Sequence, residues 1–333
     1  MIADGIHCIP IPTPFAVGRV NTYLIEDDPL TLVDSGPNSG KALDELERAL
    51  RERGHGIEDL GLIVVSHQHI DHEGLVDILA RRSGAEVAAL SPLADWLASY
   101  GDQMRADDEF AEELMRRNGI AEDVGHALRT VSAAFRGWGA AATVTRPLEE
   151  GDEIRLRDRV LRVHHRPGHS PTDTVFHDAE RRLLIGADHL IKHISSNPLI
   201  TRPVGARGAA GGGGAAAERP RALITYLESL RATREMDVDL VLTGHGEPVT
   251  EHAALIDDRF RMHERRAAKI AKRIGSHGPL TAYEIAQSLW GNVALTQAYL
   301  TLSEVLGHVD LLLERGEVAE EEGDDGVVRF SAR

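Results

Sequence analysis

The most constraining feature of the sequence is the motif HQHIDH at 67–72, which directly follows the apolar run GLIVVS at 61–66. The apolar run predicts a buried strand, and the loop after such a strand is held in a fixed place. Three imidazoles and one carboxylate this close together are ligands for borderline divalent cations. An exposed loop can contain two histidines by chance. Packing, however, does not require three histidines and an aspartate within six residues. The motif therefore predicts a metal site at a strand end.

Three later segments repeat the order of strand, small residue and ligand-type residue. They are RVHHRPGHS, LLIGADHL and LVLTGHGEP, and they deliver His169, Asp188 and His245. The 333 residues contain 17 histidines but only one cysteine, Cys8, so no internal disulfide framework forms and histidines and carboxylates must hold the metal.

The pattern along residues 1–92 alternates strands and helices, which indicates an α/β layered domain. Segments 20–27 and 30–35 predict antiparallel strands, and 39–54 predicts an amphipathic helix. Residues 95–139 then become helical and concentrate large side chains. These side chains are expected to form ordinary helix core, with a substrate-pocket wall as the alternative; they are Trp96, Tyr100, Met104, Phe110, Met115, Phe135 and Trp138.

The chain divides near residue 250. Residues 1–250 form the first predicted domain, with a flexible Gly/Ala loop at 205–217. Residues 251–333 predict a helical linker over 252–274, a helix that starts with the capping box of Thr281 and Glu284, a third helix over 295–315, and two short strands about Gly-Asp-Asp-Gly. This order resembles a winged helix.

Across residues 1–250 these motifs, with VDSG ending a strand near Asp34, resemble the metallo-β-lactamase-fold hydrolases. The resemblance implies an α/β fold, an αββα sandwich with the site at one edge of two sheets, followed by the winged-helix-like domain. It implies two sets of metal ligands and one bridging residue. These are His67, His69 and His169 for one ion, Asp71, His72 and His245 for the second, and Asp188 for both.

The same resemblance implies roles for further residues. Asp34 would hydrogen-bond within the site instead of binding metal. The presence of Asp71 and Asp188, with no cysteine ligand, is similar to the glyoxalase, lactonase and nuclease branches. These two carboxylates would be catalytic, holding a hydroxide that bridges two divalent ions, for which zinc fits and iron or manganese fit nearly as well. His189 and His193 are candidate substrate contacts, with an ordinary position behind the ligands or at the surface as the alternative.

The favoured function is a binuclear metal-dependent hydrolase acting on an ester, thioester or lactone of a small molecule. The alternative is an endoribonuclease or phosphodiesterase, because the C-terminal extension resembles that of the lactamase-β-like endoribonuclease. Nucleic acid is disfavoured, since the formal charge is −16, the segment 295–314 has no Lys or Arg, and the hairpin sequence is EEEGDDG. A second alternative, an inert binding protein that keeps the fold, conflicts with the complete ligand set.

The sequence also carries expectations about surroundings. No run reaches the roughly 18 apolar residues of a membrane span, and the first residues do not resemble a signal peptide. We therefore expect a cytoplasmic protein without a membrane partner, for which a homodimer through the C-terminal domain is an open alternative.

Overall fold

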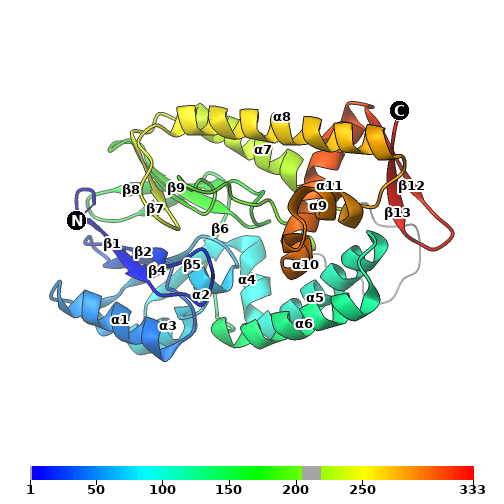
Figure 1. Cartoon of the computed structure of the whole chain (residues 1–333). Coiled ribbons are helices and arrows are strands. Elements are labelled where there is room, and N and C mark those ends of the chain that lie inside the picture. The colour runs from blue at the N-terminus through cyan, green and yellow to red at the C-terminus, as the bar shows by residue number, and fades with distance from the viewer. Residues whose placement is uncertain (1, 205–218) are drawn as a thin grey trace.

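The structure is a computed structural model that describes residues 2–204 and 219–333, so the predicted Gly/Ala loop at 205–217 lies outside the described residues. Two sheets face each other, with helices on both outer sides (Figure 1). The first sheet contains, in spatial order, β1 (Ile6–Ile11), β2 (Val20–Ile25), β3 (Thr31–Val33), β4 (Leu62–Val65), β5 (Glu86–Leu90) and β6 (Arg146–Leu148). The second contains β11 (Leu240–Thr243), β10 (Leu183–Ala187), β9 (Thr174–Asp178), β8 (Val160–His165) and β7 (Glu153–Arg155).

Alternation along the strands explains why four layers form. In β4, Leu62 and Val64 pack between the two sheets, whereas Ile63 and Val65 pack under the helices α1 (Gly40–Arg51) and α3 (Val76–Ser83). Successive side chains of a strand point to opposite faces, so a wholly apolar strand needs cover on both faces. The helices α7 (Ala222–Arg234) and α8 (His252–His277) lie on the outer side of the second sheet (Figure 1). The αββα prediction is thereby confirmed.

The elements predicted near the N-terminus are confirmed in kind. β2 and β3 pair antiparallel, and α1 begins after Ser39, whose side chain accepts a hydrogen bond from the backbone of Ala42. The sequence analysis did not predict β1. Its Pro10 argues against a strand, but β1 lies at the edge of its sheet, where a residue without an N–H is tolerated.

The predicted helical insertion consists of α4 (Ser91–Ala98), α5 (Tyr100–Arg117), α6 (Glu122–Phe135) and the short η2 (Arg136–Trp138). α5 and α6 pack side by side and extend away from the sandwich toward the C-terminal segment (Figure 1). Leu114 and Met115 of α5 belong to the same apolar cluster as the C-terminal helices. The insertion therefore joins the two parts of the molecule.

The C-terminal segment contains α8, α9 (Ala282–Trp290), α10 (Val293–Thr296), α11 (Ala298–Glu314) and an antiparallel hairpin of β12 (Val318–Glu322) and β13 (Val328–Ala332). The capping box of Thr281 and Glu284 is present at the start of α9. The helix predicted over 295–315 is instead two helices. Gln297, with φ −125° and ψ 43°, leaves the helical conformation between α10 and α11.

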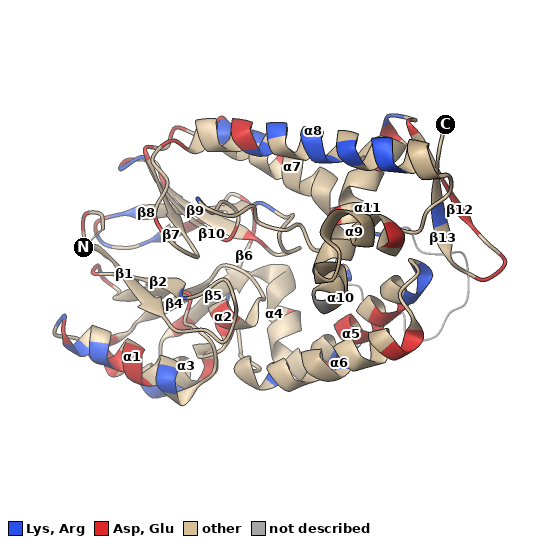
Figure 2. Cartoon of the chain, in the orientation of Figure 1, with Lys and Arg blue, Asp and Glu red and all other residues tan. Residues whose placement is uncertain are grey.

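Charge is unevenly distributed over this segment. Lys and Arg residues lie along the length of α8, whereas Asp and Glu predominate in the β12–β13 hairpin (Figure 2). Within residues 2–204 and 219–333, no helix combines the length and the apolar character that crossing a membrane requires.

Candidate metal centre

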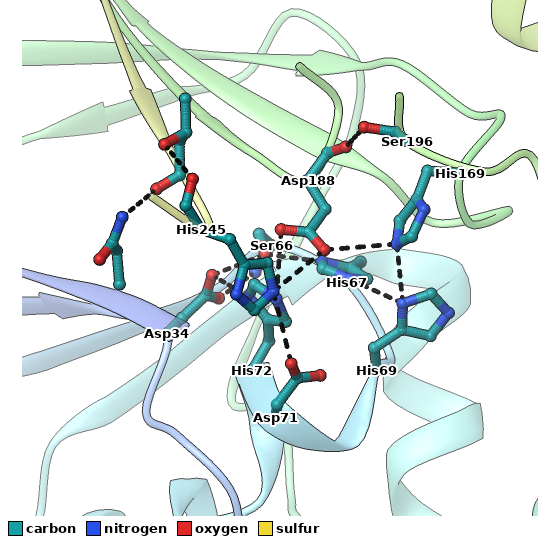
Figure 3. Close-up of polar contacts among 12 residues, drawn as sticks. Asp34, Ser66, His67, His69, Asp71, His72, His169, Asp188, Ser196 and His245 are labelled. Carbon is teal, nitrogen blue, oxygen red and sulfur yellow. Dashed lines mark hydrogen bonds and ion pairs between the residues drawn. The ribbon is translucent and has the colours of Figure 1, made fainter. Parts of the chain in front are cut away.

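Four loops at one edge of the sandwich bring the predicted ligands together (Figure 3). The loop after β4 and the short helix α2 (Ile70–Glu73) carry the HQHIDH motif. The loops after β8, β10 and β11 carry His169, Asp188 and His245. The two sheets touch at this edge, because Val20 and His245 form an isolated bridge and the Asn21 N–H donates to the Gly244 carbonyl at 2.7 Å.

The first ligand group consists of three imidazoles. His67 Nε2 lies 3.1 Å from His69 Nδ1, which lies 2.9 Å from His169 Nε2. His67 is fully buried, so water cannot solvate its ring. Three ring nitrogens at these separations could hold one cation.

The second group consists of Asp71, His72 and His245, and Asp188 lies between the two groups. His245 Nε2 is 3.5 Å from Asp71 Oδ2. One oxygen of Asp188 is 3.5 Å from His72 Nε2, and the other is 3.5 Å from His169 Nε2 and 3.4 Å from His245 Nε2. A carboxylate in this position can contact a cation in either group.

The outer nitrogen of each of three rings has a fixed acceptor. His245 Nδ1 donates to the Arg19 carbonyl at 2.9 Å, and His169 Nδ1 donates to the Asn197 carbonyl at 3.2 Å. His72 Nδ1 donates to Asp34 Oδ2 at 2.8 Å. A carbonyl or carboxylate oxygen only accepts, so each of these Nδ1 atoms carries a proton. Each Nε2 points to the centre and presents a lone pair there when its ring is neutral.

Asp34 holds a second ring through Ser66, a residue that the sequence analysis did not single out. The Ser66 hydroxyl donates to Asp34 Oδ2 at 2.8 Å and accepts from His67 Nδ1 at 2.9 Å. Asp34 has a φ of 58°, in the left-handed region that Asp tolerates better than most residues. Asp34 therefore lies beside the candidate ligands and hydrogen-bonds to His72 and Ser66. The only sequence signal for Ser66 is its position at the end of GLIVVS, directly before the motif.

The donor set fits a bound cation. His72 Nε2 and Asp188 Oδ1 are buried without a hydrogen-bond partner, which costs free energy unless a positive charge satisfies them. The absence of a side chain at Gly244 leaves room for the carboxylate of Asp188, because a Cβ there would lie 2.0 Å from Asp188 Oδ1. Only glycine permits this approach.

The protein groups alone favour ligand protonation states at His69 and Asp188, whereas His245 carries a second proton when no cation is bound. Burial lowers the pKa of His69 to about 3, which keeps its ring neutral. Burial acts to raise the pKa of Asp188, but the charges and hydrogen bonds of His72 and His245 outweigh it and hold that pKa well below its usual value. Burial acts to lower the pKa of His245, yet Asp188 and Asp71 raise it to about 9. A cation at the centre would take the place of that proton.

A cavity of about 690 Å³ opens beside this centre. His69, Asp71, His169, Asp188 and His245 line one part of it. The rest is lined by the insertion, by α11 and by the loops after β1 and β10. Among the large residues predicted in 95–139, those that line the cavity are Trp96, Met104, Phe110, Met115 and Phe135. The expectation of ordinary helix core is thus incomplete, because many of these side chains face a cavity.

The two candidate substrate histidines do not reach this cavity. His189 is buried, with Nε2 2.8 Å from the Thr233 hydroxyl, and its ring packs on Tyr226. His193 has 64% of its side chain exposed, and its Nε2 lies 3.7 Å from Glu247 Oε2. Gln68, which was not predicted, lines the cavity and accepts a hydrogen bond from the Ser170 hydroxyl at 2.8 Å.

Fold and site together define the class of protein. The chain belongs to the metallo-beta-lactamase superfamily, which residues 16–245 match, and residues 270–333 match the metallo-beta-lactamase-like, C-terminal domain. The family resemblance found in the sequence is therefore confirmed.

Particular relatives narrow this class to hydrolases. The chain is similar to the probable metallo-hydrolase YqjP of Bacillus subtilis (strain 168), with 32% identity over 313 residues, covering 94% of this chain and 93% of that protein. It is also 30% identical over 199 residues to the human acyl-coenzyme A thioesterase MBLAC2, covering 56% of this chain and 64% of that protein. The prediction of an enzyme of the hydrolase class is confirmed.

Two solved structures share the whole architecture. The metallo-beta-lactamase family protein TTHA1429 from Thermus thermophilus has a TM-score of 0.79 and 22% identity, with 100% of both chains covered. A beta-lactamase domain protein from Burkholderia ambifaria has a TM-score of 0.77 and 26% identity, covering 99% of this chain and 93% of that chain. The C-terminal helices and hairpin are therefore part of a recurring fold.

Proposed function

We propose that this chain is a binuclear metal-dependent hydrolase whose substrate is a thioester. The observation that carries the proposal is the juxtaposition of the buried His and Asp cluster with an apolar cavity. The cluster supplies the chemistry and the cavity supplies a place for an uncharged acyl group. The name of the human relative, an acyl-coenzyme A thioesterase, supports a thioester over an ester or lactone.

The candidate ligands form two sets, one for each proposed ion. His67, His69 and His169 would hold one divalent ion, Asp71, His72 and His245 the other, and Asp188 both; zinc, iron or manganese suit these donors. Bound ions of this kind activate water at neutral pH and polarise the carbonyl under attack.

The chain's own residues keep that geometry in place. Asp34, Ser66 and the carbonyls of Arg19 and Asn197 fix the rings, so the ligands need not reorganise during the reaction. Asp71 and Asp188 are the carboxylates that would orient the attacking water. The reaction adds one water to the thioester carbonyl and breaks the C–S bond, which gives a carboxylate, a proton and a thiol.

A phosphodiester substrate has less support. The two arginines that line the cavity are already paired, Arg202 with Asp107 at 3.0 Å and Arg129 with Glu112 at 2.7 Å. On the basic helix α8, Arg259 donates to three carbonyls, among them that of Ile191, and Arg266 pairs with Glu304. These four arginines already have protein partners and are therefore less available to phosphates.

The test compares kcat/KM for octanoyl-coenzyme A with that for bis(p-nitrophenyl) phosphate, using metal-loaded protein with and without a chelator. We expect chelator-sensitive turnover of the thioester and a much lower rate with the phosphodiester. A preference for the phosphodiester would contradict the proposal and favour the nuclease alternative. Turnover of both that survives complete metal removal would contradict the metal assignment.

A further inference from the structure

The cavity beside the metal centre follows one face of α5. Met104, Asp107, Asp108, Ala111 and Met115 all line it, and their spacing places them on one side of a helix. At 1.5 Å per residue, the wall from Met104 to Met115 extends roughly 16 Å. The cavity is therefore long in one direction.

The two ends of this wall belong to different parts of the molecule. Met104 packs against the core beneath the first sheet, whereas Met115 and Leu128 pack in the cluster of the C-terminal helices. Tyr299 and Leu300 of α11 supply lining from the other side. The cavity thus continues from the metal ligands to the junction of the insertion and the C-terminal segment.

Charged side chains in the wall are neutralised by neighbours. Asp107 pairs with Arg202, and Asp108 pairs with Arg136 and accepts from the Ser132 hydroxyl at 2.7 Å. Away from the metal ligands, each charged residue that lines the cavity in the described part of the chain has such a partner. The wall therefore suits an occupant without charge along its length.

Apolar side chains also surround the opening. Val17, Ile194 and Leu300 line the cavity and yet have exposed fractions of 40%, 46% and 40%. They come from the loop after β1, the loop after β10 and α11, so three separated segments contribute exposed apolar surface to the cavity. Exposed apolar groups that gather around a cavity indicate a binding site for an apolar ligand.

From these observations we propose that the cavity holds the hydrocarbon chain of an unbranched fatty-acyl thioester, with α5 setting the longest chain that fits. The carbonyl lies at the metal ligands and the chain extends along Met104 and Ala111 toward Met115. The inference rests on the proposed thioester hydrolysis and adds the class of acyl group.

The test is a series of coenzyme A thioesters from acetyl through butanoyl, octanoyl and dodecanoyl to hexadecanoyl. Each methylene that enters the cavity should raise kcat/KM about fourfold until the far end is reached. In Ala111→Phe the ring occupies the middle of the cavity, so the ratio of kcat/KM for dodecanoyl-coenzyme A to that for butanoyl-coenzyme A should fall about tenfold or more. Ala133→Phe, at an exposed position of α6, is the matched control and should keep the wild-type profile.

A binding measurement separates this inference from the proposed reaction. Calorimetric titration of dodecanoate should show binding to the wild type and to Ala133→Phe, and weaker binding to Ala111→Phe. Thioester turnover with a flat chain-length profile and no dodecanoate binding would overturn the inference and leave thioester hydrolysis standing. Dodecanoate binding that Ala111→Phe weakens, without turnover of any thioester, would overturn the reaction and keep the assignment of the cavity. If Ala111→Phe does not fold, Leu128→Ala enlarges the far end and should shift the optimum to longer chains; an unchanged optimum would contradict the inference.

Discussion

The metal centre and the cavity beside it are built in opposite ways. The centre consists of buried polar side chains from four strand-end loops, and four of its rings are held by a second partner. The cavity consists mainly of apolar side chains from the helical insertion and α11, and the charges in its wall are paired. Under the proposed function, the sandwich would supply the reaction and the added helices would select the substrate. Changes in the two regions should therefore have separable effects.

The largest effect is expected at the bridging carboxylate. Asp188→Asn keeps the size of the side chain but removes the charge that both ligand groups share, so kcat/KM should fall about 1000-fold for every acyl chain length. Metal content, measured by mass spectrometry, should fall as well, while the thermal transition shows that the variant folds. Activity and metal content like those of the wild type would mean that Asp188 is not a ligand.

The next largest effect on kcat/KM is expected at Asp34, which contacts the candidate ligand His72. Asp34→Asn tolerates the positive φ of this position but weakens the acceptor for His72 and Ser66, so kcat/KM should fall about 10- to 100-fold. Metal affinity should weaken in parallel, and the chain-length profile should not change. His193→Gln, at an exposed position outside the cavity, is the control. A loss of kcat/KM confined to long acyl chains would contradict the separate roles of the metal centre and the cavity.

A pH effect is expected in the C-terminal helices that support the cavity. Burial, with His308 3.1 Å away, lowers the pKa of His263 to about 3, so the folded protein keeps this ring neutral. The unfolded chain takes up a proton below its ordinary pKa of about 6.5, and stability is therefore lost as the pH falls, by about 2 kcal/mol at pH 5. His263→Leu should remove that part of the difference in unfolding free energy between pH 7 and pH 5.

Chemical denaturation at the two pH values measures this difference. His277→Leu, at the exposed end of the same helix, should show the wild-type difference. If His263→Leu also shows it, the neutral buried state of His263 is wrong.

The smallest effect is expected at the opening of the cavity. Leu300→Ser removes an apolar side chain that is only partly buried, so kcat/KM for dodecanoyl-coenzyme A should fall about three- to tenfold, with butanoyl-coenzyme A unaffected. Leu295→Ser is the matched control, because Leu295 is 45% exposed and does not line the cavity. Equal losses in both variants would show that the opening has no special role.

The convergence of the candidate ligands could be expected from the sequence because its signals are local. Each candidate ligand segment follows a strand. Strands that run parallel, such as β8, β10 and β11, bring their carboxyl ends to one edge of a sheet. Asp34 is found for the same reason. Ser66 is missed because a serine before a motif is common, and only its simultaneous contacts with Asp34 and His67 reveal its role.

The cavity could not be derived in the same way. Helical spacing places Met104, Ala111 and Met115 on one face of α5, but the same pattern also describes a helix that packs against solid core. Whether that face meets a partner or a void depends on α11, which lies nearly 200 residues later in the chain. The orientation of His189 is similarly non-local, since Thr233 and Tyr226 on α7 fix it. The break at Gln297 has no proline or glycine to signal it.

The most direct test of the account is a titration of Zn²⁺ into chelator-stripped protein, with calorimetry and octanoyl-coenzyme A hydrolysis measured on the same samples. The account predicts two bound ions per chain and hydrolysis that appears as the sites fill. Hydrolysis by the stripped protein at the full rate, or Zn²⁺ that fails to bind to the folded chain, would contradict it.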